Sequence, residues 1–120
     1  MKTLLILMSF FSSLFGGNTK QIDTITVLDK AEFKNAIAHK VQLVDVRTPN
    51  EYASGHIKNA INIDFFNQTA FVKAFEKLDK EKPVYIYCKS GNRSNKAAQK
   101  LDSLGFKNIY DLRGGYMNWN

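Results

Sequence analysis

The sequence predicts an α/β fold in which an open, mainly parallel sheet carries helices on both faces. Segments with strand character alternate with segments of helical periodicity along the domain. The helical segments are long enough to serve as right-handed crossovers, which place successive strands parallel to each other. The single cysteine, Cys88, directly follows one of the strand patterns. Because ligands of such sheets bind beyond the carboxyl ends of the strands, Cys88 marks the expected site.

The N-terminal segment, residues 1–17, predicts an export signal. Lys2 precedes an apolar or small stretch from Leu4 to Phe15, and two glycines follow. This length is typical of a secretory signal, whereas a membrane span needs ~20 apolar residues. An uncleaved membrane anchor stays open as an alternative, because no small-x-small cleavage site lies near Phe15.

Residues 18–21 then form a short tether, and residues 22–120 form one domain. A segment of about 100 residues can enclose one hydrophobic core but not two. We expect this domain to be exported to the bacterial periplasm. It would contact the membrane only if the signal remains uncleaved.

The first strand of the domain is expected at residues 22–28, where apolar and polar residues alternate. Asp29 and Glu32 then form a capping box, which starts a helix that ends near residues 39–40. This helix should bury one face, made by Phe33, Ala36 and Ile37.

The second strand is expected at residues 41–46, which are rich in β-branched side chains. Asp45 and Arg47 lie at its carboxyl end. Residues 48–58 contain Pro49 and Gly55 and are predicted to be a loop or a short helical turn. A further short strand is expected at residues 60–63.

The second half of the domain repeats this alternation. Residues 69–78 predict a helix with a core-facing stripe of Phe71, Val72, Phe75 and Leu78. Strands are expected at residues 83–88 and 108–112. Between them, a helix is marked by Ala97, Ala98, Leu101 and Leu104, and Gly105 should end it.

The position of Cys88 is typical of a nucleophile. A strand that ends in a tight loop and feeds a helix directs backbone N–H groups and the helix dipole at one point, where a thiolate is favoured. A buried structural cysteine is the alternative. The small and basic residues that follow favour a reactive thiolate that handles an anion, and these candidate binding residues are Lys89, Ser90, Gly91, Asn92, Arg93 and Ser94.

The loop after Cys88 suggests particular roles for its members. Gly91 allows a positive φ where a side chain would clash. Lys89 and Arg93 add positive charge for an oxyanionic ligand, although either could be an ordinary surface base. Ser94 could donate a hydrogen bond to a bound sulfur, as Ser90 could, or it could cap the following helix.

Composition excludes several other classes of function. With one cysteine, the chain can form no intramolecular disulfide, no Cys-x-x-Cys redox pair and no multi-cysteine zinc site, so we expect neither a metal nor a cofactor. The net charge is +6, but the lysines are spread without a basic run, which argues against nucleic-acid binding. A modest basic excess suits a small anionic substrate.

Taken together, several motifs resemble those of the single-domain rhodaneses. The likeness extends from Thr24 to Trp119 and rests on Asp45-Val46-Arg47, Glu51-Tyr52, Gly55-His56-Ile57, Tyr87-Cys88-Lys89-Ser90-Gly91-Asn92-Arg93-Ser94, Leu104-Gly105-Phe106 and the end of the chain. The resemblance implies a sulfurtransferase in which Cys88 carries sulfane sulfur as a persulfide. The donor would be thiosulfate or a persulfide, and the acceptor a thiol, cyanide or a protein.

The resemblance also implies supporting roles for residues outside the loop. Asp45, Arg47, Glu51 and His56 would brace the region after the second strand, and His56 would form a structural hydrogen bond rather than transfer protons. Gly114, Gly115 and Trp119 would provide a turn and a packing cap near the loop.

Two other functions remain to be compared. Dual-specificity phosphatases of the same fold use a Cys-x5-Arg loop to surround phosphate, whereas the Cys-x4-Arg spacing of Cys88 and Arg93 makes a tighter ring suited to sulfur. A protein-binding module, or a carrier that delivers sulfur only to a dedicated partner, is the second alternative. The intact cysteine argues against an inactive scaffold.

Overall fold

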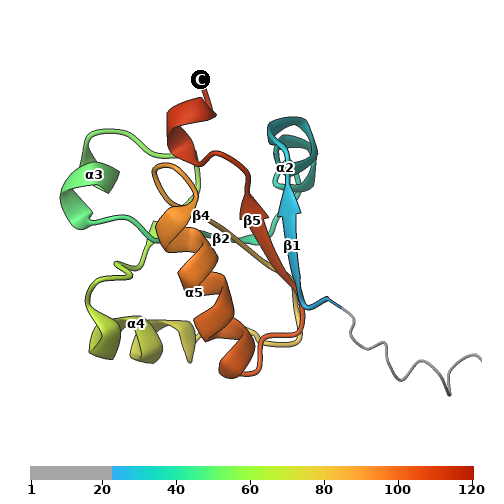
Figure 1. Cartoon of the computed structure of the whole chain (residues 1–120), viewed down its shortest axis with the longest axis vertical. Coiled ribbons are helices and arrows are strands. Elements are labelled where there is room, and N and C mark those ends of the chain that lie inside the picture. Colours follow the sequence, from blue (N-terminus) through green and yellow to red (C-terminus); the bar gives the residue numbers. More distant parts are fainter. Residues whose placement is uncertain (1–22) are drawn as a thin grey trace, which may run out of the picture.

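The computed structural model describes residues 23–120, and its five strands form one parallel sheet. The strand order is β1-β5-β4-β2-β3, which places β4 at the centre (Figure 1). The strands are β1 (Ile25–Leu28), β2 (Gln42–Asp45), β3 (Ile61–Asn62), β4 (Val84–Tyr87) and β5 (Ile109–Leu112). The predicted parallel α/β sheet is confirmed. The export signal and the tether, residues 1–17 and 18–21, lie outside the described residues.

Helices lie on both faces of this sheet. On one face, α4 (Gln68–Phe75) and α5 (Asn92–Ser103) share a core with β4 (Figure 1). On the other face, α2 (Lys30–Ala36) and the 3-10 helix η2 (Tyr116–Asn118) pack in a second core. The remaining helix, α3 (Pro49–Ala53), lies in the connection between β2 and β3.

The central strand β4 shows how the sequence supplies both cores. Successive side chains of a strand point to opposite faces. Accordingly, Val84 and Ile86 are buried against α4 and α5, whereas Tyr87 is buried in the core beneath α2. Because both faces of β4 are covered, the position of its carboxyl end is fixed by packing on either side.

Local signals set most helix ends. The capping box of Asp29 and Glu32 is present, and Gly105, with a φ of 98°, follows the end of α5 as predicted. The first helix, however, ends at Ala36 rather than near residues 39–40, because the chain tightens there into turns such as the bond from Ala38 N–H to the Asn35 carbonyl. Within residues 23–120, no helix combines the length and apolar character needed to cross a bilayer.

Candidate active site

Cys88 lies between β4 and α5 at the carboxyl edge of the sheet. The strand is flanked by β2 and β5, so its end is held on two sides. Cys88 is 1% exposed, whereas Lys89 and Ser90 are exposed to solvent. The sulfur therefore lies at the base of a loop whose outer residues are accessible.

The loop turns into α5 at Gly91, whose φ of 108° is a conformation that side chains other than glycine rarely allow. The Gly91 amide donates a hydrogen bond to Cys88 Sγ at 3.0 Å. The first bond of the helix runs from Asn95 N–H to the Gly91 carbonyl, so the amides of residues 92–94 have no acceptor within the helix. These donors and the helix dipole favour negative charge at the sulfur.

Ser94 lies in the first turn of α5 and is fully buried. Its Oγ is 3.4 Å from Cys88 Sγ, with the thiol as donor. Of the two roles open to Ser94 from the sequence, that of a helix cap is wrong, because Gly91 occupies the N-cap position. Ser94 instead contacts the Cys88 sulfur directly.

The turn at Gly114 and Gly115 brings the backbone that follows it into hydrogen-bonding contact with the cysteine loop. The amide of Tyr116 donates to the Cys88 carbonyl at 2.8 Å, and that of Met117 donates to the Lys89 carbonyl at 3.0 Å. A Cβ atom on Gly115 would overlap the Lys89 carbonyl and lie 2.7 Å from the Cys88 oxygen. Glycine is therefore required here for the close approach of two backbone segments.

Arg93, the last residue of the Cys-x4-Arg loop, is joined to α3. Its guanidinium forms two hydrogen bonds to the Glu51 carboxylate, of 2.7 and 3.0 Å, and its side chain is 18% exposed. The same guanidinium lies over the exposed ring of Phe66, 5.3 Å from its centroid. The charge of Arg93 is thus already paired within the chain.

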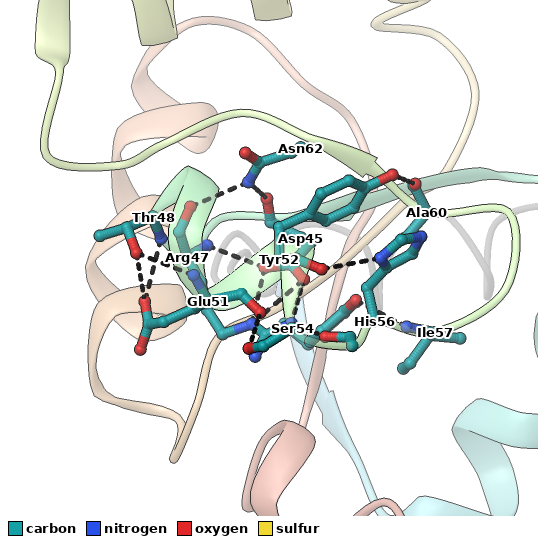
Figure 2. Close-up of polar contacts among 12 residues, drawn as sticks. Asp45, Arg47, Thr48, Glu51, Tyr52, Ser54, His56, Ile57, Ala60 and Asn62 are labelled. Atoms are coloured by element: carbon teal, nitrogen blue, oxygen red, sulfur yellow. Dashed lines mark hydrogen bonds and ion pairs between the residues drawn. The ribbon is translucent and has the colours of Figure 1, made fainter.

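Glu51 has a second role at the start of α3. It accepts hydrogen bonds from the amide and hydroxyl of Thr48, completing a capping box (Figure 2). The hydrogen bonds from Arg93, with smaller help from Thr48, lower the pKa of Glu51 to about 2 against the effect of desolvation. The carboxylate therefore links the helix start of α3 to the cysteine loop.

Asp45 and Arg47 form a buried ion pair at the carboxyl end of β2. Their side chains are 0% and 5% exposed, and their nearest charged atoms are 2.6 Å apart. Arg47 also donates to the Gly55 carbonyl at 2.7 Å, and Asn62 donates to the carbonyls of both members of the pair (Figure 2). This network fixes the segment after β2.

His56 lies on the outer side of the same segment. Its Nδ1 is 2.9 Å from the Tyr52 carbonyl, and its ring stacks on that of Tyr52 with centroids 3.7 Å apart (Figure 2). Tyr52 in turn donates to the Ala60 carbonyl at 2.6 Å. These contacts hold the His56 ring against Tyr52 of α3.

Sequence reasoning missed two residues near this site, Asp111 and Phe66. Asp111 is 3% exposed on β5, and the signal that could have revealed it is a carboxylate inside a strand expected to be buried. Phe66 is 64% exposed beside Arg93 and gave no distinct signal. Among residues 23–120, no three His, Cys, Asp or Glu side chains gather in a way that could hold a metal ion.

The parallel sheet, with its cysteine at the carboxyl end of the central strand, defines an open α/β domain whose candidate site lies at that edge of the sheet. The family model described as a rhodanese-like domain matches residues 29–120, and the chain belongs to this family. It is 36% identical over 119 residues to the uncharacterized protein YqhL of Bacillus subtilis, covering 99% of this chain and 91% of that protein.

Two further comparisons agree with this family. The chain is 39% identical over 79 residues to the thiosulfate sulfurtransferase GlpE of Coxiella burnetii, covering 66% of this chain and 71% of GlpE. It is similar in structure to a rhodanese-like domain protein of Staphylococcus aureus, with a TM-score of 0.70, 31% identity and coverage of 79% of this chain and 91% of that one. The similarity to solved rhodanese-like structures supports the fold independently of any one motif.

Proposed function

We propose that this domain is a sulfurtransferase that moves sulfane sulfur from a donor to a thiophilic acceptor through a persulfide on Cys88. The observation that carries the proposal is the placement of the Cys88 sulfur at the start of α5, where the Gly91 amide donates to it at 3.0 Å. The similarity to a protein named as a thiosulfate sulfurtransferase supports the same reaction.

The first half of the reaction loads sulfur onto Cys88. The thiolate attacks the outer sulfur of thiosulfate, the sulfur–sulfur bond of the donor breaks, and sulfite leaves with the bonding electron pair. A persulfide donor would react in the same way and release a thiolate. The amides of residues 92–94 are then available to the new terminal sulfur anion, because the helix supplies them with no acceptor.

The second half returns the cysteine to its initial state. Cyanide or an acceptor thiolate attacks the terminal sulfur, and the Cys88 thiolate leaves. The products are thiocyanate or a new persulfide. Charge and electrons balance over the two halves, so the scheme requires no redox cofactor and no general base once the thiolate has formed.

Other residues contribute by shape and charge. Lys89 is exposed beside the sulfur and would attract an anionic donor. Arg93, whose charge is shared with Glu51, would mainly hold the loop against α3. Asp45, Arg47 and His56 would keep the neighbouring segment in place, so that the loop is preorganised before substrate arrives.

Phosphate transfer by the same cysteine is disfavoured. A phosphatase needs a free guanidinium to hold phosphate oxygens in the transition state. Arg93 lies in a Cys-x4-Arg loop and is engaged by Glu51 through two hydrogen bonds. Both the loop spacing and the occupied guanidinium therefore support sulfur as the group transferred.

A protein acceptor is favoured by one observation. The Phe66 ring is 64% exposed next to Arg93, and a large exposed apolar side chain beside a reactive site suits contact with another protein. A partner-dependent sulfur carrier is therefore the second candidate function. Replacing Phe66 by serine should then slow transfer to a protein thiol more than transfer to cyanide.

The proposal is tested by the rate of thiocyanate formation from thiosulfate and cyanide. Cys88→Ser should abolish this activity and leave the circular dichroism spectrum unchanged. Because Cys88 is the single cysteine, the variant removes every thiol from the chain. Turnover by the serine variant near the wild-type rate would overturn the proposal.

A further inference from the structure

A cavity of about 460 Å³ opens beside the start of β2, on the face of the sheet that carries α2. Its floor is apolar, because Leu43 is 5% exposed in the core beneath α2, and Ile37 and Val41 pack against the same core. Its rim is polar and consists of His39, Lys40, Lys58 and Asn59. This size, with an apolar floor and a few polar groups, is typical of a site for a small molecule.

The charged groups around this cavity have one sign. Lys40 and Lys58 supply two cations, and His39 adds a ring that can donate a hydrogen bond. No aspartate or glutamate lines the cavity, and neither lysine forms an ion pair with another residue of the range 23–120. A cavity lined by charges of one sign concentrates ions of the opposite sign. The cavity therefore favours an anion.

An adjoining cavity shows why the first is the better anion site. It has a volume of about 390 Å³ and shares Lys40 and Val41 with the first. Its other cation, Lys82, is accompanied by the carboxylate of Asp79. The side-chain amide of Gln42, which also lines it, is already hydrogen-bonded to the backbone of Asp79 at 3.0 and 2.7 Å. An anion would meet less competition in the first cavity.

The turn that carries Lys58 is anchored on both sides. It is closed by a hydrogen bond from the Ala60 amide to the Ile57 carbonyl at 3.0 Å. The Ala60 carbonyl accepts from the Tyr52 hydroxyl at 2.6 Å, and the Ile57 amide donates to the Tyr87 hydroxyl at 3.0 Å (Figure 2 shows the Tyr52 bond). The backbone of this wall is thus preorganised, so a ligand would need to order only the side chains of the rim.

We propose that this cavity binds a small polyanion, namely a compact molecule with two or more phosphate or carboxylate groups. Lys40 and Lys58 come from different segments of the chain, so each can pair with a different anionic group. The apolar floor can accommodate the carbon skeleton of an organic anion.

This ligand would be distinct from the sulfur donor. Residues 40–41 and 58–59 precede β2 and β3, at the amino edge of the parallel sheet. Cys88 follows β4, at the carboxyl edge. The inference therefore goes beyond the proposed function and does not depend on it.

The test is a titration of the ¹⁵N-labelled full chain with pyrophosphate and, separately, with citrate, followed by amide chemical shifts. At least one probe should bind saturably, with shifts that cluster at residues 37–43 and 58–60. The probe that binds more tightly identifies phosphate or carboxylate as the group recognised. Acetate, which carries a single charge, should bind more weakly than either.

Substitutions of the rim test the role of charge. Lys40→Gln and Lys58→Gln should each weaken binding about fivefold, and together roughly 25-fold, because each removes one unit of charge from the site. The matched control is Lys73→Gln, at an exposed lysine of α4 on the opposite face of the sheet. At an ionic strength of about 0.1 M, charges more than ~10 Å apart are largely screened, so this control should leave the affinity unchanged.

Several results would overturn the inference. They are the absence of binding by both probes, shifts that do not saturate or that spread over lysines of the whole surface, and shifts centred on the cysteine loop. An equal loss of affinity in Lys73→Gln would overturn it as well. Because none of these readouts involves sulfur transfer, failure here would leave the proposed function standing, and the reverse also holds.

Discussion

Replacing Glu51 by glutamine separates two roles of Arg93, namely a brace of the loop and a binding group for anions. In the wild type the guanidinium is held by two hydrogen bonds to the Glu51 carboxylate. Glutamine keeps the size of the side chain and can retain one of these bonds, but it removes the negative charge. Arg93 would then present an unpaired positive charge beside the cysteine loop.

The cost in stability follows from the exposure of the pair. The side chains are 18% and 29% exposed, so solvent screens their attraction in part. Loss of a partly exposed, charge-assisted pair should lower the free energy of unfolding by about 1–2 kcal/mol at pH 7. The pKa of Glu51 is lowered from 4.5 to about 2, so this stabilisation is present above pH 4.5 and is lost as the pH falls toward 2. The variant should lack this part of the acid dependence.

The gain should appear in the choice of sulfur donor. An added unit of positive charge near a donor anion is worth about 1 kcal/mol in water, or roughly fivefold in kcat/KM. We therefore expect Glu51→Gln to raise kcat/KM for thiosulfate severalfold relative to an uncharged organic trisulfide. Urea denaturation and steady-state kinetics with the two donors measure the two effects.

Glu32→Gln is the matched control for this experiment. Glu32 occupies the same third position in the capping box of α2, but it has no arginine partner among residues 23–120. It should lose only the smaller capping contribution and leave the donor preference unchanged. If both variants lose equal stability, and neither changes kcat/KM for thiosulfate relative to that for the trisulfide, Arg93 neither braces the loop through Glu51 nor can bind the donor anion.

Three further predictions follow from the loop. Gly115→Ala should destabilise the fold and impair sulfur transfer, because its Cβ would overlap the Lys89 carbonyl. The control, Gly105→Ala, is also at positive φ, but its Cβ would lie 3.8 Å from the nearest side-chain atom, so it should reduce stability and preserve transfer. Equal kinetic defects in the two variants would argue against a specific contact at Gly115. Lys89→Ala should raise KM for thiosulfate, and the defect should shrink as salt is added; a salt-independent defect would show that charge is not the cause. The wild type should hydrolyse aryl phosphates far more slowly than it transfers sulfur, and the reverse order would favour the phosphatase alternative.

Short-range signals explain what could be predicted from the sequence. The capping box at Asp29 and the glycine after α5 each depend on a few consecutive residues, and both are present. A second capping box, from Thr48 to Glu51, starts α3 within a segment for which the sequence predicts a loop or a short helical turn. Proline is in fact favoured in the first turn of a helix, so the same residues contain the signal for α3.

Contacts between distant segments could not be predicted in the same way. Glu51 and Arg93 are 42 positions apart, and their pairing depends on how α3 is placed against the loop. The sequence allows Ser94 to be a helix cap, but α5 begins after Gly91, three residues earlier, and the Ser94 hydroxyl contacts the sulfur instead.

The most direct test of the account is the intact mass of the protein after incubation with thiosulfate. One sulfur atom should be added, peptide mapping should place it on Cys88, and cyanide should remove it completely. The same spectrum of protein from an exporting host shows whether residues 1–17 have been cleaved. No added sulfur, or an adduct that persists in Cys88→Ser, would contradict the assignment of Cys88 as the sulfur carrier.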